Sequence, residues 1–404
     1  MIKREIYMNR IRPFIDKDLV KILTGIRRCG KSVMLELIKE ELRIQGVSEL
    51  QFISISFEDV DNQRLCSFEA LHTFVSEKIK DIKGRAYLFL DEIQEVDAWE
   101  KCINSLRVKF DVDIYITGSN AKLLSGEFAT YLAGRYVEFL IYPFSFSEFV
   151  EMYNIIKPNE NVAEAEAFKQ YIIFGGMPFL MNLNLQAAPC HQYLQDVYNS
   201  VVLKDVMKRN KIRDVDLLER IIMYLLANVG KTFSATSISK YFKNENRKVS
   251  PETILSYIKA CEEAFLFYRA KRQDLVGKKI LSVNEKYYVA DHGLREAVYG
   301  KNNRDIEIVL ENIVYIELLR KGYSVTVGKI NNMEVDFVAE KHGELIYVQV
   351  AYVLATESTI SREFGSLKAI DDNYSKYVVS MDEIEMSSDG IRHMNIREFL
   401  KLDI

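Results

Sequence analysis

The stretch TGIRRCGKS, at residues 24–32, holds the residue types that bind the phosphate groups of nucleotides. Gly25, Gly30, Lys31 and Ser32 follow the order GxxxxGKS, after an apolar run and before a helix-like segment. Glycines let the loop curl so that successive N–H groups point at phosphate oxygens, and the positive end of the following helix adds to the attraction. Lys31 can reach the β- and γ-phosphates, and the Ser32 hydroxyl can bind Mg²⁺. The stretch predicts a phosphate-binding loop; the alternative is a glycine turn whose lysine is merely solvated.

Two adjacent acids, Asp91 and Glu92, end the apolar stretch AYLFLDE. A continuous apolar run is typical of a strand that is buried on both faces, so these acids are expected at its carboxyl end. Asp91 can complete the shell of the Mg²⁺ ion, and Glu92 can accept a proton from the attacking water or orient it. The alternative is a solvated strand end, but the position after the phosphate loop, with one strand between, favours the second half of the same site.

Two further polar residues are candidates for catalysis. Asn120, in YITGSN, follows another strand and can touch the γ-phosphate or the water; alternatively it caps a helix at 121–132. Arg135, in LAGRYVEF, can act as an arginine finger on the nucleotide of a neighbouring subunit, or as a sensor in its own subunit, because its planar cation is always charged. A surface salt bridge is the alternative for Arg135. A homo-oligomer is expected if Arg135 acts in trans.

The segment MEVDFVAEKHGELIYVQVAY, at residues 333–352, predicts two strands joined by a tight turn. The first strand presents Asp336, and the second presents Gln349 and then Ala351. An acid, a second oxygen ligand on the next strand and a lysine two residues later would be the working face of a metal-dependent nuclease. Here alanine stands at the position of the lysine.

Alternating strand and helix patterns place these residues in an α/β fold. Strands are expected at 19–24, 50–59, 86–92, 113–119 and 136–143, with helices between them. Such alternation predicts a parallel sheet covered by helices on both faces.

The rest of the chain reads as three further modules. A helical segment runs to about residue 210, two helices and an apolar strand at 214–272 suggest a winged helix-turn-helix, and an α/β pattern follows. The expected domains are 1–150, 151–212, 213–275 and 276–404.

Composition is that of a soluble protein with an ordinary charge balance. The 404 residues carry a net charge of −4, so any contact with nucleic acid must be local. Basic residues gather at 204–213 and 268–279, flanking the winged-helix pattern, and these segments are candidates for DNA contact. The scattered cysteines argue against a zinc site, and no apolar run approaches the roughly 20 residues that span a bilayer. We expect a cytoplasmic protein without membrane contact.

Six stretches follow one another along the chain: GIRRCGKS, FLDEIQEVDAWE, ITGSN, LAGRYVEF, YPFSFSEF and FGGMP. Taken together, they resemble the prokaryotic AAA-type ATPases that carry a C-terminal DUF4143 domain. The resemblance covers nearly the whole chain and implies a P-loop core of the AAA/ASCE type, with ATP and Mg²⁺ bound and ATP hydrolysed. By this resemblance the strand at 113–119 lies between those at 19–24 and 86–92. The residues expected to contact ATP are Gly25, Arg28, Cys29, Gly30, Lys31, Ser32 and Val33.

The C-terminal domain of that family resembles the PD-(D/E)XK (restriction-endonuclease-like) nuclease fold. Carried over by position, Glu311 is the helix acid, Asp336 the strand acid and Gln349 the third metal ligand. The alternative is an α/β capping domain in which Glu311 and Asp336 pair with basic neighbours. Ala351 lacks the cation, whose loss costs roughly 10²–10³-fold in rate where such groups have been removed. We therefore expect an ATPase whose nuclease-like domain is degenerate and serves DNA or protein contact. The alternatives are an ATP-regulated metal-dependent DNA nuclease and an ATP-binding switch with little turnover.

Overall fold

The chain divides into two compact units. The computed structural model describes residues 2–124, 132, 134–158, 163–277, 279–300 and 305–403. Unit 1 comprises Met1–Ile141 and Glu263–Phe265, and unit 2 comprises Tyr142–Glu262 and Leu266–Ile404. The first expected domain, residues 1–150, contains the Met1–Ile141 part of unit 1 and ends shortly after it.

Unit 1 contains a five-stranded parallel sheet. Its strands are β1 (Val20–Thr24), β2 (Phe52–Ser56), β3 (Ala86–Asp91), β4 (Val112–Gly118) and β5 (Tyr136–Leu140). They lie in the order β2-β3-β4-β1-β5, so all five expected strands form and β4 lies between β1 and β3 as expected. Because the strands are parallel, the segments that follow β1, β3 and β4 meet at the same edge of the sheet.

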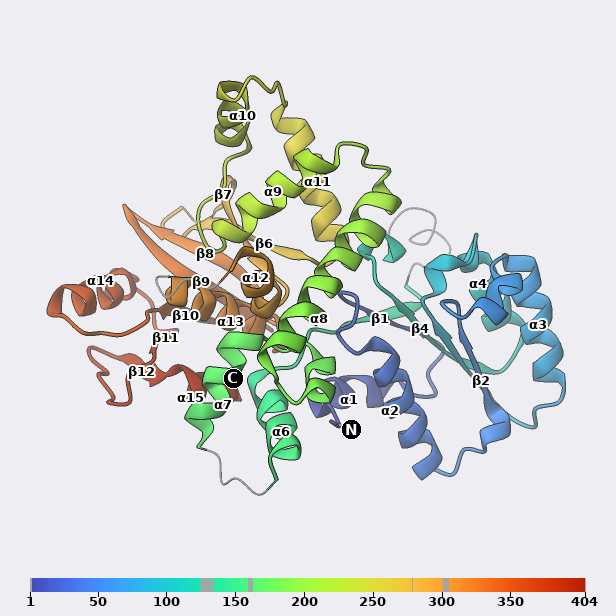
Figure 1. The fold of residues 1–404 in the computed structure, drawn as a ribbon. Helices are drawn as coiled ribbons and strands as arrows, with labels where there is room; N and C mark the ends of the chain where they lie inside the picture. The colour runs from blue at the N-terminus through green and yellow to red at the C-terminus, as the bar shows by residue number, and fades with distance from the viewer. Residues whose placement is uncertain are drawn as a thin grey trace. The chain divides into compact units, whose positions relative to one another are not determined.

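Helices cover both faces of this sheet, as right-handed crossovers require (Figure 1). They are α1 (Glu5–Ile11), α2 (Lys31–Ile44), α3 (Phe68–Lys80) and α4 (Trp99–Lys109). Helix α2 packs on one face, while Leu71 and Val75 of α3 and Ile103 of α4 bury their side chains in the core on the other. The helix expected at 121–132 starts as a 3₁₀ turn, Ala121–Leu124, and residues 125–131 lie outside the described part of the chain.

Unit 2 begins with helices and continues into a mixed sheet. The first helices are α6 (Phe146–Ile156), α7 (Glu164–Phe174), α8 (Ala187–Ser200), α9 (Val215–Ala227), α10 (Ala235–Asn244) and α11 (Pro251–Glu263). Ser250 caps the start of α11, because the Thr253 N–H donates to Ser250 Oγ at 3.2 Å.

The sheet of unit 2 has seven strands in the order β12-β11-β10-β9-β8-β6-β7. Their bounds are β6 (Phe267–Asp274), β7 (Lys279–Val289), β8 (Ser324–Ile330), β9 (Met333–Lys341), β10 (Glu344–Val350), β11 (Ser375–Ser380) and β12 (Ile391–Asn395). The expected hairpin at 333–352 forms as β9 and β10. The β6–β7 hairpin, which follows the helices α9 to α11, belongs to this same sheet, because β6 also pairs with β8.

Four more helices accompany this sheet: α12 (His292–Tyr299), α13 (Ile306–Arg320), α14 (Glu357–Lys368) and α15 (Ile396–Lys401). Helix α13 is buried along most of its length, because its apolar residues are distributed around the whole helix and not along one stripe. The side chains of Phe364 and Leu367, from α14, pack against Val338 and Tyr347 of the sheet. The chain thus has an α/β fold in both units.

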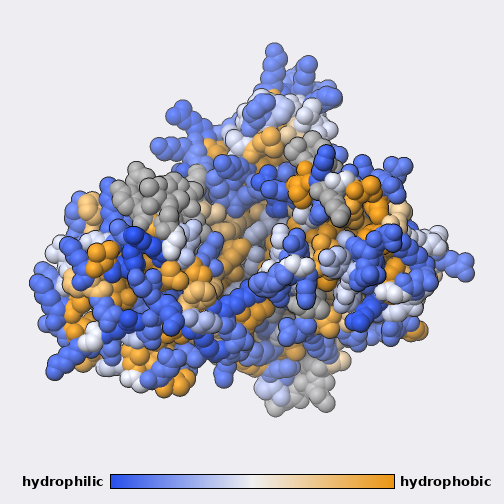
Figure 2. All heavy atoms as spheres, turned by 180° about the vertical axis from the view of Figure 1, so that it is seen from behind, coloured by the Kyte–Doolittle hydropathy of each residue, from blue (hydrophilic) through white to orange (hydrophobic). Residues whose placement is uncertain are grey.

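The surface carries the expected mixture of residue types. Figure 2 shows hydrophilic side chains over most of one face, with hydrophobic side chains in small patches among them. Within the described residues, no helix combines the length and the apolar character that crossing a membrane takes.

Candidate active site

The phosphate loop connects β1 to α2 and depends on two glycines. Gly25 has φ +142°, and a Cβ there would lie 2.2 Å from the Ile141 carbonyl oxygen. Gly30 has φ +103° and directly precedes Lys31, the first residue of α2. Both positions favour glycine, so the loop has the conformation and the helix N-terminus that the motif predicts.

Lys31 is folded back onto its own loop. Its ammonium group donates to the carbonyl oxygens of Gly25 at 3.1 Å and Ile26 at 3.2 Å, and it lies 3.7 Å from Glu92 Oε1. The side chain is 4% exposed. The cation is therefore held at the center of the loop, beside the acid expected to activate water.

Asp91 and Ser32 meet at the mouth of the loop. The Ser32 hydroxyl donates to Asp91 Oδ2 at 2.8 Å, and the Thr117 hydroxyl, from β4, donates to Asp91 Oδ1. Burial raises the pKa of Asp91 above its usual value, against the effect of these two hydroxyl groups. A hydroxyl and a carboxylate side by side are oxygen ligands of the kind that Mg²⁺ prefers, so the residues present fit this ion.

Glu92 is held in one orientation by several neighbours. Its backbone is left-handed, with φ 56°, and its N–H donates to Thr117 Oγ1 at 2.9 Å. Its Oε2 accepts from Ser119 Oγ at 3.0 Å and from the Gln94 amide. Burial of the carboxylate raises its pKa, but Lys31 and the other neighbours outweigh burial, so the pKa of Glu92 lies below its usual value. Glu92 is thus ionised at neutral pH, as a general base must be.

The remaining predicted residues divide between the two edges of the sheet. Asn120 is buried two residues after the end of β4, at the edge that carries the loop and the acids. Arg135 precedes β5, and its carbonyl oxygen accepts from the N–H of Val20, the first residue of β1. Arg135 therefore lies at the opposite edge from the loop, so the structure does not bring it to the nucleotide site of its own unit. Its exposed side chain lies 3.5 Å from Asn104 Oδ1, and a role in trans stays a prediction.

Three loop residues named in the sequence interpretation have different environments. Cys29 is fully buried, and burial raises the pKa of its thiol. Arg28, with φ 68°, and Val33 are exposed. Cys29 contributes its backbone to the loop, while the side chains of Arg28 and Val33 remain accessible to a ligand.

Sequence reasoning missed the residues that support the site. Thr117 contacts both acids, Gln94 and Ser119 hold Glu92, and the Arg4 guanidinium donates to the Cys29 carbonyl oxygen at 2.9 Å. Gln94 and Thr117 lie in the stretches LDEIQ and ITGSN, which were singled out for other residues. Their polar side chains could therefore have been considered as partners of the two acids. No sequence motif points to Arg4, because the residue that it contacts is 25 positions away along the chain.

In unit 2 the structure brings together the residues of the nuclease-like constellation. The Asp336 N–H donates to Gln349 Oε1 at 3.2 Å, and Asp336 Oδ2 accepts from the Val350 N–H at 2.9 Å. Burial and the nearby Glu311 raise the pKa of Asp336 well above its usual value. Ala351 is buried in the apolar cluster with residues of α14. In the described parts of the chain, no three His, Cys, Asp or Glu side chains are arranged to hold a metal ion.

The two basic segments differ in how much of their charge is available. In 204–213, Lys204, Lys208, Lys211 and Arg213 are exposed. In 268–279, Arg269 lies 3.1 Å from Glu262 and Arg272 lies 3.3 Å from Glu334, and Lys278 lies outside the described residues. The first segment therefore offers more unneutralised charge to a phosphate backbone.

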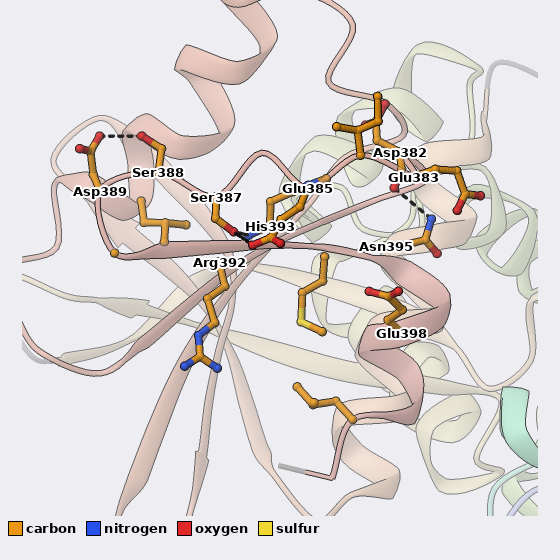
Figure 3. Close-up of a pocket in the computed structure, with 15 residues that line it drawn as sticks. Asp382, Glu383, Glu385, Ser387, Ser388, Asp389, Arg392, His393, Asn395 and Glu398 are labelled. Atoms are coloured by element: carbon orange, nitrogen blue, oxygen red, sulfur yellow. Dashed lines mark hydrogen bonds between the residues drawn. The ribbon is translucent and has the colours of Figure 1, made fainter.

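A pocket of about 870 Å³ lies beside β12 and α15 in unit 2 (Figure 3). Its lining is more acidic than basic, because it includes Asp382, Glu383, Glu385, Asp389 and Glu398 but only one arginine and one histidine. The buried ring of His393 has partners on both nitrogens: Nε2 lies 2.8 Å from Ser380 Oγ, and Nδ1 accepts from the Met386 N–H at 3.0 Å. None of the predicted site residues lines this pocket.

Comparison with known proteins agrees with the architecture of unit 1. Residues 17–150 match the AAA domain family, and residues 165–305 match a domain of unknown function, DUF8612. DUF8612 is a different family from the DUF4143 domain that the sequence resemblance implied, and a DUF4143 identity is not shown. A Walker-type ATPase of Pyrococcus abyssi shares the fold with a TM-score of 0.53 at 14% identity, over 74% of this chain and 95% of that one.

Two sequence relatives match along most of their length. An uncharacterized protein of Haemophilus influenzae is 39% identical over 99% of this chain and 98% of its own. An uncharacterized protein of Methanocaldococcus jannaschii is 33% identical over 87% of this chain and 79% of its own. The chain therefore belongs to the family of these two proteins, and its N-terminal part is an AAA-type domain.

Proposed function

We propose that this protein binds ATP with Mg²⁺ and hydrolyses it at the edge of the unit 1 sheet. The observation that carries the proposal is the meeting of three groups: the Lys31 ammonium, the Ser32–Asp91 hydrogen bond of 2.8 Å, and Glu92 held by Thr117 and Ser119. Cation, metal ligands and base are the parts that phosphoryl transfer to water requires.

Each group has a definite task. The N–H groups at the start of α2 bind phosphate oxygens, and Lys31 exchanges its contacts with the Gly25 and Ile26 carbonyls for contacts with the β- and γ-phosphates. Ser32 and Asp91 would hold Mg²⁺, which neutralises charge on the phosphate oxygens when bound. Glu92 accepts a proton from the attacking water, and its Oε2 is held by Ser119 and Gln94.

Phosphate release under multiple turnover tests this proposal. We expect hydrolysis by the unchanged chain, no binding of ATP by Lys31→Ala, and binding without turnover by Glu92→Gln. Glu77→Gln, an exposed acid on α3, is the matched control and should keep the full rate. If Glu92→Gln turns over ATP like the unchanged chain, the assignment of the base is wrong. If the unchanged chain binds ATP without turnover, the protein is a nucleotide-dependent switch.

We further propose that hydrolysis drives conformational change in unit 2, which contacts DNA through residues 204–213. The exposed Lys204 and Lys208 support this proposal, because four residues apart they lie on one side of a helical segment. Fluorescence anisotropy of labelled duplex DNA should show weaker binding by the double variant Lys204→Glu/Lys208→Glu. The slope of log K against log salt concentration should also become shallower, by about two. Lys78→Glu, on α3 of unit 1, is the control. Equal affinity of the double variant and the unchanged chain would contradict the proposal.

A further inference from the structure

A buried lysine lies among the acids of the nuclease-like constellation in unit 2. The ammonium of Lys286, on β7, is 3.0 Å from Glu311 Oε1, 2.8 Å from Glu334 Oε1 and 3.9 Å from Asp336 Oδ1. The lysine is 4% exposed. Burial lowers the pKa of Lys286, but the three acids outweigh burial and raise it, so the side chain remains a cation. We call these four residues the Lys286 cluster.

The oxygen atoms that a metal ion would need are already hydrogen-bonded. Glu311 Oε1 also accepts from the Tyr288 hydroxyl at 2.7 Å. Gln349 Oε1 accepts from the Asp336 N–H, while its amide nitrogen donates to Glu363 Oε2 at 2.9 Å. Mg²⁺ demands close, near-octahedral oxygen ligands, and an ammonium group among these acids occupies the place such an ion would take.

The connection between α9 and α10 covers the Lys286 cluster. The Gly230 N–H donates to the Tyr287 carbonyl oxygen at 3.1 Å, and the Phe233 N–H donates to the Glu285 carbonyl oxygen at 2.8 Å. Gly230 has φ +71°, and a Cβ there would lie 2.9 Å from Glu311 Oε2. This segment therefore packs against Glu311 with no room for a side chain at position 230, and its backbone is hydrogen-bonded to β7 beside Lys286.

We propose that Lys286 is the resident cation of this cluster, so that Glu311 and Asp336 bind neither Mg²⁺ nor Mn²⁺. The residues present do not fit the metal ion that a nuclease fold implies, because the protein supplies its own positive charge. Lys286 thereby ties β7 to α13 and β9. The inference is independent of ATP hydrolysis, since all of its residues belong to unit 2.

Titration with Mn²⁺, followed by the electron paramagnetic resonance of the free ion, tests this inference. The nucleotide-free protein carries Ser32→Ala, so that the phosphate loop does not contribute a metal site. In this background we expect no Mn²⁺ binding that Asp336→Asn abolishes. When Lys286→Met is added to the same background, we expect one bound Mn²⁺ per chain. Adding Asp336→Asn to that variant should abolish this binding again.

Two controls make the result specific. Lys286→Arg keeps the positive charge and should bind no Mn²⁺, and Lys279→Met removes an exposed lysine from the same strand and should also bind none. Mn²⁺ binding by the chain with Lys286 intact, abolished by Asp336→Asn, would overturn the inference. So would a folded Lys286→Met protein without the added site. The first of these measurements leaves Lys286 unchanged, so it can overturn the inference even if Lys286→Met fails to fold.

Discussion

The Lys31 ammonium lies 3.7 Å from the Glu92 carboxylate, and both side chains are buried. This pairing joins the group expected to bind the γ-phosphate to the group expected to activate water. Under the proposed function, Lys31 moves onto a phosphate of the bound nucleotide, so that the Oε1 atom of Glu92 loses its cation and becomes available to water. We therefore propose that nucleotide binding and activation of the base are linked through this one contact.

The first prediction concerns the base itself. Glu92→Gln should lower kcat by about 10²–10⁴-fold while ATP still binds, because an amide cannot accept the proton of the attacking water. Rapid-quench measurement of ADP formation in a single turnover separates this chemical step from product release. Retention of the normal single-turnover rate would show that Glu92 is not the base.

The second prediction concerns Thr117, whose hydroxyl contacts both acids. Thr117→Val leaves the buried Glu92 N–H without its acceptor, which should cost on the order of 1–3 kcal/mol of folding free energy. Because Asp91 also loses a hydrogen bond, more Mg²⁺ should be needed for half-maximal ATPase activity. Urea unfolding and a Mg²⁺ titration measure the two effects. Thr73→Val, on an exposed face of α3, should change neither.

The third prediction concerns the two acids and pH. The pKa of Asp91 is raised by burial in the folded protein, so the stability it contributes is present at low pH and is lost as pH rises through its folded pKa. Glu92 has a lowered pKa, so its stability is present above its unfolded value and is lost as pH falls through the folded one.

At pH 7 to 8, Asp91→Asn should therefore stabilise the nucleotide-free protein and Glu92→Gln should destabilise it. Both differences should shrink in acid, and both variants should lose ATPase activity. Thermal unfolding at several pH values measures them. Equal shifts of Tm for the two variants at neutral pH would contradict the assigned pKa directions.

The fourth prediction concerns Arg4, which supports the phosphate loop from a distant part of the sequence. Arg4→Met removes the hydrogen bond to the Cys29 carbonyl oxygen and should weaken ATP binding by about tenfold, which corresponds to about 1.4 kcal/mol. Lys3→Met, at the exposed neighbouring position, is the control. Unchanged ATP affinity in folded Arg4→Met protein would show that the loop does not depend on this contact.

Much of unit 1 follows from local sequence. Apolar runs and one alternating segment predicted its five strands, and the glycine loop predicted the start of α2. The placement of Arg135 could have been recognised too, since a residue that precedes a parallel strand lies at the edge opposite the loop. Contacts such as those of Thr117 and Arg4 depend on tertiary packing, which periodicity does not report.

Unit 2 was less predictable. Strand β12 and helix α14 were not anticipated. Strand β6 was assigned to the winged-helix module, although it pairs with β7 and β8 in the C-terminal sheet. Lys286 shares no motif spacing with Asp336 or Gln349, so its place among the acids emerges only when β7 and α13 come together. The order of the strands in the sheet brings β7 close to α13, and the hydrophobic pattern of a strand does not determine which strands become its neighbours.

Calorimetric titration with MgATP tests the central claim most directly. The account predicts one nucleotide bound per chain with measurable heat, and no binding by Lys31→Ala at the same protein concentration. The absence of any heat of association for the unchanged, well-folded chain, confirmed by a second method such as equilibrium dialysis, would contradict the phosphate loop as a nucleotide site and with it the roles of Asp91 and Glu92.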